Sequence, residues 1–145
     1  MSEDYLKKAD EWFERGKQED DIFVRFILFY ISYEVLLKIQ GLDKYRLNNY
    51  IRKEFFKNID KKILEDLKIK LDRKPLENMK PGFNEKVKLN DINDFESILK
   101  FINIGRNNLF HGDKSLGIER DRMIVNFGSQ ILEVLLAVMN RWDGK

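Results

Sequence analysis

The stretch Ile22-Phe-Val-Arg-Phe-Ile-Leu-Phe-Tyr-Ile-Ser-Tyr-Glu-Val-Leu-Leu-Lys-Ile39 is the most apolar run of this 145-residue chain. Its apolar positions go almost all the way round a helix, and such a helix is normally surrounded by others. Asp20 and Asp21 suit its start, because acidic side chains favour the positive end of the helix dipole. Gly41 suits its end. We therefore expect a central core helix over residues 21–40.

Three charged residues interrupt this run, namely Arg25, Glu34 and Lys38. Each is costly in lipid, so the run is expected to be a buried helix and not a membrane span. An ionised group on a buried helix needs a partner. The alternative is that Arg25 and Glu34 end at the rim of the core or pair locally, as Glu34 can with Lys38.

Helical periodicity extends over most of the remaining chain. It predicts helices over residues 2–17, 44–58, 60–71, 93–110 and 117–142. Ser2 suits the first cap, Asn93 with Glu96 forms a capping-box pattern, and Gly112 suits a helix end. The side chains expected on one face of residues 2–17 are Tyr5, Leu6, Ala9, Trp12 and Phe13. Those expected to face inward in residues 44–58 are Tyr45, Leu47, Tyr50, Ile51 and Phe55.

The periodicity fails from residue 72 to residue 90, where Pro75, Pro81 and Gly82 predict one long loop. No stretch has a convincing strand pattern. The expected fold is therefore all-α, an up-and-down bundle of about five to six helices, in a single domain over residues 1–145.

Composition excludes several classes of site. The chain has no cysteine, which excludes thiol nucleophiles, disulfides and cysteine-ligated zinc. A single histidine excludes a multi-histidine metal site within one chain, and no local Asp/Glu pattern indicates magnesium. We expect no metal and no cofactor. The acidic start of the chain is unlike a secretory signal, so a cytoplasmic protein is expected.

The net charge of +2 is unevenly distributed. Residues 1–21 hold four Lys/Arg against eight Asp/Glu, whereas residues 43–74 hold eleven against six. The second segment is either a solvated helix face or a surface that attracts a polyanion.

The stretch Arg106-Asn-Asn-Leu-Phe-His111-Gly112 contains the only histidine. Positions four apart on a helix differ by about 40°, so Asn107 and His111 share a face, and the long side chain of Arg106 can reach it. Imidazole transfers protons near neutral pH, and guanidinium binds phosphate oxygens. Together they fit metal-independent cleavage of RNA by its own 2′-hydroxyl.

This chemistry usually needs two proton-transfer groups, and each chain supplies one histidine. A two-fold homodimer that places both copies of His111 in one cleft meets the requirement. The alternative is that His111 is a hydrogen-bonded structural residue at a helix end. An arginine five residues before a histidine also occurs by chance, so the spacing alone does not decide between the two.

The stretch from Arg106 to Gly112, on the penultimate long helix of an all-α domain, resembles the HEPN superfamily. The resemblance extends to the aromatic-rich segment from Phe26 to Leu37, which looks like the part of that family carrying a recurrent acidic or polar position. A polar residue directly after the arginine is typical of the family, and Asn107 supplies it.

The resemblance implies a helical bundle that dimerises with its Arg and His motifs facing across the interface. Many members are metal-independent ribonucleases of toxin–antitoxin, abortive-infection and CRISPR defence systems. By this resemblance Arg106 and His111 are the catalytic pair. Asn107 becomes the polar helper, and Glu34 matches the upstream acidic residue.

The implied partners are RNA, a second copy of the chain, and a cognate antitoxin or nucleotidyltransferase-type protein. One toxin subfamily carries a tyrosine two residues after the histidine, where this chain has Asp113. That difference argues against control by adenylylation of this tyrosine. Since some members of the superfamily lack activity, two alternatives stay open: a non-catalytic nucleotide- or RNA-binding or dimerisation module, and a purely structural helical domain.

Overall fold

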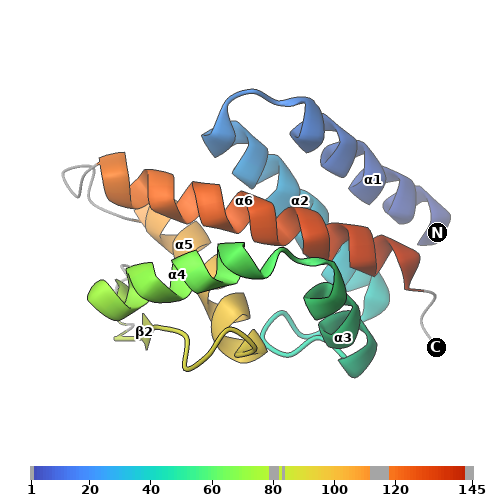
Figure 1. Ribbon diagram of the computed structural model, residues 1–145. Coiled ribbons are helices and arrows are strands. Elements are labelled where there is room, and N and C mark those ends of the chain that lie inside the picture. Colours follow the sequence, from blue (N-terminus) through green and yellow to red (C-terminus); the bar gives the residue numbers. More distant parts are fainter. Residues whose placement is uncertain (1, 79–81, 83, 112–117, 143–145) are drawn as a thin grey trace. The chain divides into compact units, whose positions relative to one another are not determined.

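The computed structural model describes residues 2–78, 82, 84–111 and 118–142, and in this part of the chain it contains six helices and one two-stranded sheet (Figure 1). The elements are α1 Ser2–Gln18, α2 Ile22–Gln40, α3 Asn49–Asn58, α4 Lys61–Arg73, β1 Leu76–Glu77, β2 Lys86–Val87, α5 Phe95–His111 and α6 Ile118–Arg141. The predicted all-α helical class is confirmed.

The chain divides into two compact units. The first comprises Met1–Ile59 and Ser129–Lys145, and the second comprises Asp60–Gly128. Helix α6 therefore contributes its C-terminal part to the first unit and its N-terminal part to the second. The single domain expected over residues 1–145 stays a prediction.

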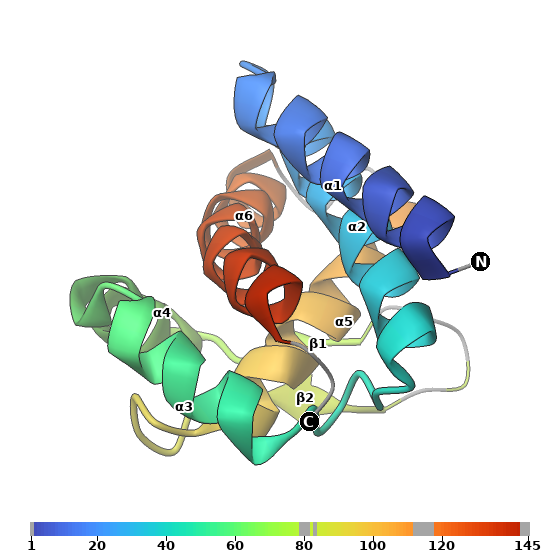
Figure 2. The same cartoon turned by 90° about the vertical axis from the view of Figure 1, so that its right-hand side faces the viewer.

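Helices α1 and α2 pack against each other as an antiparallel pair in the first unit (Figures 1 and 2). The Ser32 hydroxyl donates to the backbone carbonyl of Ala9 at 2.6 Å. The rings of Phe13 and Phe29 lie 5.6 Å apart. A Cβ at Gly16 would lie 2.6 Å from the Phe29 ring, so this close approach requires glycine.

The ends of α2 agree with the sequence. The Asp21 carboxylate accepts hydrogen bonds from the backbone N–H groups of Phe23 and Val24. Gly41 ends the helix in the left-handed conformation, with φ 63°.

Arg25 and Glu34 of α2 are not buried without a partner. The Arg25 guanidinium donates to the Glu19 carbonyl, at 3.0 Å from Nε and 2.7 Å from Nη2. Glu34 is exposed, and in the described part of the chain it forms no ion pair with Lys38. Neither side chain is therefore an unpaired charge in the core.

Residues 44–58 differ from the expected continuous helix. Helix α3 begins only at Asn49, and the Asn48 side chain accepts from the N–H of Ile51 as its cap. Leu47 has φ 53°, a left-handed conformation that interrupts helical geometry before Asn48. The expected inward side chains Tyr45 and Tyr50 are exposed, whereas Ile51 and Phe55 are buried. In α1, Tyr5 and Leu6 are also exposed, whereas Ala9 and Phe13 on the same predicted face are buried.

The second unit contains a hairpin where a loop was expected. Strands β1 and β2 pair antiparallel, with Leu76 opposite Val87, and the N–H of Asn78 donates to the carbonyl of Glu85 at 2.8 Å. Both strands contact α5 (Figure 2). Two-residue strands are too short to show alternating hydrophobicity, which explains why no strand pattern is visible in this part of the sequence.

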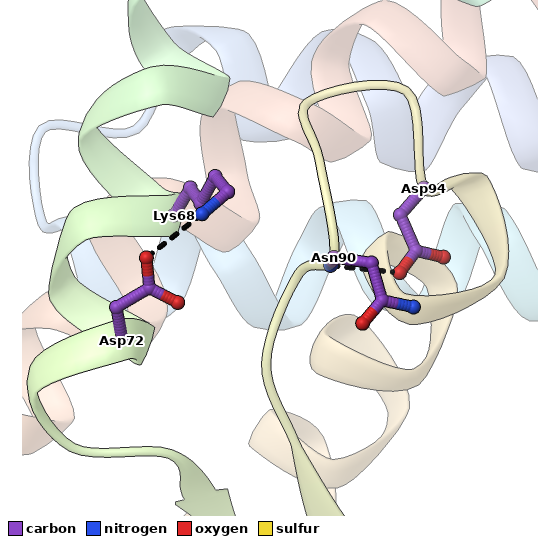
Figure 3. A network of polar contacts seen from close by, with 4 residues as sticks. All are labelled: Lys68, Asp72, Asn90 and Asp94. Carbon is purple, nitrogen blue, oxygen red and sulfur yellow. Dashed lines mark hydrogen bonds and ion pairs between the residues drawn. The ribbon is translucent and has the colours of Figure 1, made fainter.

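The start of α5 also corrects the expectation, because Asp94 and not Asn93 caps it. The Asp94 carboxylate accepts a hydrogen bond from the N–H of Ser97 at 3.2 Å. It also accepts one from the N–H of Asn90 at 3.0 Å (Figure 3). Burial alone would raise the pKa of Asp94. The hydrogen bonds from Asn90 and Ser97, with the charge of Lys100, outweigh burial and hold this pKa below its usual value.

Within the described residues one helical stretch, Glu119–Arg141, is long and apolar enough to cross a membrane by length and composition. Of its most apolar window, 61% is buried in the structure. The core helix of a globular protein can be equally long and apolar, so this finding is weak support for a membrane span.

We predict that Asp94→Ala lowers the free energy of unfolding by about 1 kcal/mol at neutral pH, the usual effect of losing a helix cap. Because the pKa is lowered in the folded state, the contribution of Asp94 is present above its unfolded pKa of about 4 and is lost as the pH falls through the folded pKa. Urea unfolding at pH 7 and pH 3 measures this difference.

Asp72→Ala is the matched control, since Asp72 pairs with Lys68 at 2.8 Å on the solvent-facing side of α4 in the same unit (Figure 3). Such a pair contributes only about 0.3–0.5 kcal/mol. An Asp94→Ala effect no larger than that of Asp72→Ala would show that Asp94 does not cap α5.

Candidate functional site

The last two turns of α5 carry the Arg-x4-His stretch. The helix backbone continues through His111. The side chain of His111, and Gly112 and Asp113 altogether, lie outside the described residues. The predicted helix-ending role of Gly112 therefore stays a prediction.

Gly105 holds the beginning of this stretch against α6. It is buried, and a Cβ in its place would lie 2.7 Å from Cγ2 of Ile124. Ile124 is itself buried, so it has little room to move away. The close approach of α5 to α6 therefore sets where the next residue, Arg106, leaves the helix.

Arg106 is half-buried, and its Cζ lies 4.8 Å from the centroid of the Phe110 ring. Phe110 is 58% exposed, the most exposed of the large apolar side chains in the described residues. A cation–π contact at an exposed site is worth about 0.5–1 kcal/mol. Arg106 thus lies along its own i+4 neighbour. Its predicted reach toward the face shared by Asn107 and His111 stays a prediction.

The two adjacent amides differ in their surroundings. Asn107 is half-buried, whereas Asn108 is 8% exposed and its Nδ2 donates to the backbone carbonyl of Glu77 at 2.8 Å. Asn108 therefore joins α5 to β1. The sequence does indicate this role. Asn108 falls on the same helix face as the buried residues Phe101 and Ile104, and a polar side chain on a buried face needs a hydrogen-bond partner.

Arg120 is a second anchoring residue, and no sequence pattern indicated it. Its Nη2 donates to the carbonyls of Lys74 at 2.7 Å and Pro75 at 2.9 Å, directly before β1. Burial lowers the pKa of Arg120, and the nearby charge of Glu77 partly offsets this. No feature of the sequence separates this arginine from the other arginines of α6.

The structure brings only part of the predicted site together. Arg106 and Asn107 share one turn of α5 in the second unit. Glu34 lies on α2 of the first unit, where it is exposed. Its proposed grouping with Arg106 stays a prediction.

Among the described residues, no group of three or more His, Cys, Asp and Glu side chains could hold a metal ion. Comparisons with protein-family models, with curated proteins and with solved structures gave no match to this chain. Function must therefore be inferred from the residues themselves.

We predict that Asn108→Ala lowers the free energy of unfolding by about 0.5–1.5 kcal/mol, because it removes the hydrogen bond from this buried side chain to the carbonyl of Glu77. Asn107→Ala, one residue away and half-buried, is expected to change it by less than about 0.5 kcal/mol. Thermal or urea unfolding of the two variants measures the difference. Equal losses would contradict the division of roles between these amides.

Proposed function

We propose that this protein is a metal-independent endoribonuclease that acts on single-stranded RNA, with Arg106 and His111 as its catalytic pair. The observation that carries the proposal is the end of α5. There a partly exposed guanidinium precedes the only histidine of the chain by five residues. Guanidinium recognises phosphate, and imidazole is the side chain best suited to proton transfer near neutral pH.

In the proposed reaction the 2′-oxygen of a nucleotide attacks the adjacent phosphorus. A new P–O bond forms while the bond from phosphorus to the departing 5′-oxygen breaks. One imidazole accepts the proton of the 2′-hydroxyl, and a second imidazole gives a proton to the 5′-oxygen. Arg106 stabilises the charge that develops on the phosphorane oxygens. The products carry a 2′,3′-cyclic phosphate and a 5′-hydroxyl group.

Two imidazoles require two chains, so the proposed active unit is a two-fold homodimer. The exposed ring of Phe110 supports this, because it adds an apolar surface beside Arg106 that a second copy would cover. Asn107 is proposed to orient His111 or the phosphate. Glu34 is proposed as an auxiliary acidic residue.

The family resemblance extends the proposal to a cytoplasmic defence protein of the toxin–antitoxin type. A cognate antitoxin or a nucleotidyltransferase-type protein would then be its partner. The reading frames that neighbour its gene test this part of the proposal.

We predict that the purified protein cuts single-stranded RNA in the presence of EDTA and leaves 2′,3′-cyclic phosphate ends. His111→Ala should lower the cleavage rate by about 10²-fold or more, as expected for loss of a proton-transfer group. Arg106→Ala should lower it by about 10²–10³-fold, as for loss of a transition-state donor. Gel assays with end-group analysis measure both effects.

Arg15→Ala is the matched control for Arg106→Ala. Arg15 is an exposed arginine whose Cζ lies 5.6 Å from the Trp12 ring centroid on α1, so it also makes a cation–π contact. Its loss should leave cleavage unchanged. If folded His111→Ala protein, prepared in the same way, cleaved RNA at the wild-type rate, the assignment of His111 as a catalytic residue would be contradicted. Tight RNA binding without any cleavage by the wild type would favour the non-catalytic binding module instead.

We predict that Phe110→Ser shifts the protein from dimer to monomer and lowers cleavage at low protein concentration. Cleavage should recover as the concentration rises, because association follows mass action. Ile69→Ser is the control, since Ile69 is 50% exposed on α4 of the same unit. Light scattering measures the mass. Full activity of a wild-type protein that stays monomeric at every concentration would rule out the dimer.

A further inference from the structure

Two tyrosines of the first unit are exposed where helical periodicity predicted buried ones. Tyr45 lies in the turn between α2 and α3, and Tyr50 lies in the first turn of α3. Each is 43% exposed. Ile51 and Phe55, which were also expected to face inward, are fully buried. The two tyrosine rings are therefore not needed to fill the core.

The segment that carries these tyrosines is basic. Residues 43–58 hold five Lys/Arg against two Asp/Glu. The exposed cations Arg46, Arg52 and Lys53 form no ion pair within the part of the chain that the structure describes. Their charge therefore remains available to a ligand in solution.

Both acidic residues of this segment are already engaged. The Asp43 carboxylate accepts from the N–H of Tyr45 at 2.8 Å. The Glu54 carboxylate pairs with Lys57 at 3.1 Å. Neither carboxylate is thus committed to neutralising Arg46, Arg52 or Lys53.

The turn that carries Tyr45 is held from inside the unit. The buried Tyr33 hydroxyl donates to the carbonyl of Lys44 at 3.2 Å. Burial raises the pKa of Tyr33, so this hydroxyl stays protonated and remains a donor. The carbonyl of Asp43 accepts from the N–H groups of Arg46 and Leu47. A turn fixed in this way loses little conformational entropy when a ligand binds.

We propose that the exposed residues Tyr45, Arg46, Tyr50 and Lys53, which we call the basic aromatic patch, bind single-stranded nucleic acid. Bases stack on the two tyrosine rings, and the cations meet the phosphates, a combination that proteins use to bind single strands without strong sequence preference. That the biological ligand is RNA rests on the proposed nuclease function. It adds a substrate-holding surface in the first unit, separate from Arg106 and His111 in the second.

Tyr5 provides an internal comparison. It is also 43% exposed, and Lys8 lies 5.7 Å from its ring centroid on α1. Its segment, however, is acidic, with four Lys/Arg against eight Asp/Glu over residues 1–21. An acidic surface repels phosphates. We therefore do not expect Tyr5 to contact nucleic acid, although its ring is exposed and has a cation beside it.

Fluorescence anisotropy with labelled oligo(dT) tests the patch on the 145-residue chain carrying His111→Ala. Oligo(dT) lacks the 2′-hydroxyl, so binding is measured without cleavage. The double variant Tyr45→Ala/Tyr50→Ala should bind about tenfold more weakly or worse. The double Phe variant should keep most of the affinity, because phenylalanine retains the stacking ring. Tyr5→Ala should bind normally.

The salt dependence gives a second, independent measurement. For a single strand, the slope of log affinity against log salt should fall by about 0.7 for every cation–phosphate interaction that a substitution removes. Arg46→Ala/Lys53→Ala should therefore flatten the slope, even if a tyrosine variant folds poorly. The proposal is overturned if these cation and tyrosine variants bind as the parent does, if Tyr5→Ala weakens binding equally, or if vesicles of anionic lipid bind while oligo(dT) does not.

The two proposals fail in different ways. Oligo(dT) binding through the patch without RNA cleavage by the wild type would remove the nuclease and keep the patch. Cleavage of RNA with unchanged KM by Tyr45→Ala/Tyr50→Ala would remove the patch and keep the nuclease.

Discussion

Hydrogen bonds from buried or half-buried side chains to backbone carbonyls join the elements within both units. In the first unit Ser32 joins α2 to α1, and Tyr33 joins α2 to the turn before α3. In the second unit Asn108 joins α5 to β1, and Arg120 joins α6 to the residues before β1. A buried polar group without a partner costs about 1–3 kcal/mol, so each of these bonds selects one arrangement of its two elements.

Two of the candidate functional side chains, Arg106 and Tyr45, directly follow a residue whose backbone is held by packing or by a hydrogen bond. Arg106 follows Gly105, whose backbone lies against Ile124. Tyr45 follows Lys44, whose carbonyl accepts from Tyr33. A rigid backbone beside an exposed side chain holds that side chain ready for a ligand, since less entropy is lost on binding.

The proposed chemistry and the proposed binding surface belong to different units of the chain. The Arg-x4-His stretch lies in the second unit, and the basic aromatic patch lies in the first. Helix α6 contributes residues to both units. This division allows affinity for nucleic acid and the rate of the reaction to be changed by separate substitutions, which is what makes the two proposals separable in experiments.

The sequence by itself determined the all-α class, the bounds of α2 and the approximate bounds of α1, α4 and α6, because these depend on local rules of periodicity and capping. It also identified Arg106, Asn107 and His111 as neighbours on one helix. It did not determine the short hairpin, since two-residue strands exist through partners distant in sequence. Only the tertiary structure decided that Asn108 is an anchor, that Gly105 is a packing residue, and that Tyr45 and Tyr50 face outward. Which side of a helix is buried depends on what packs against it, and no local pattern specifies that neighbour.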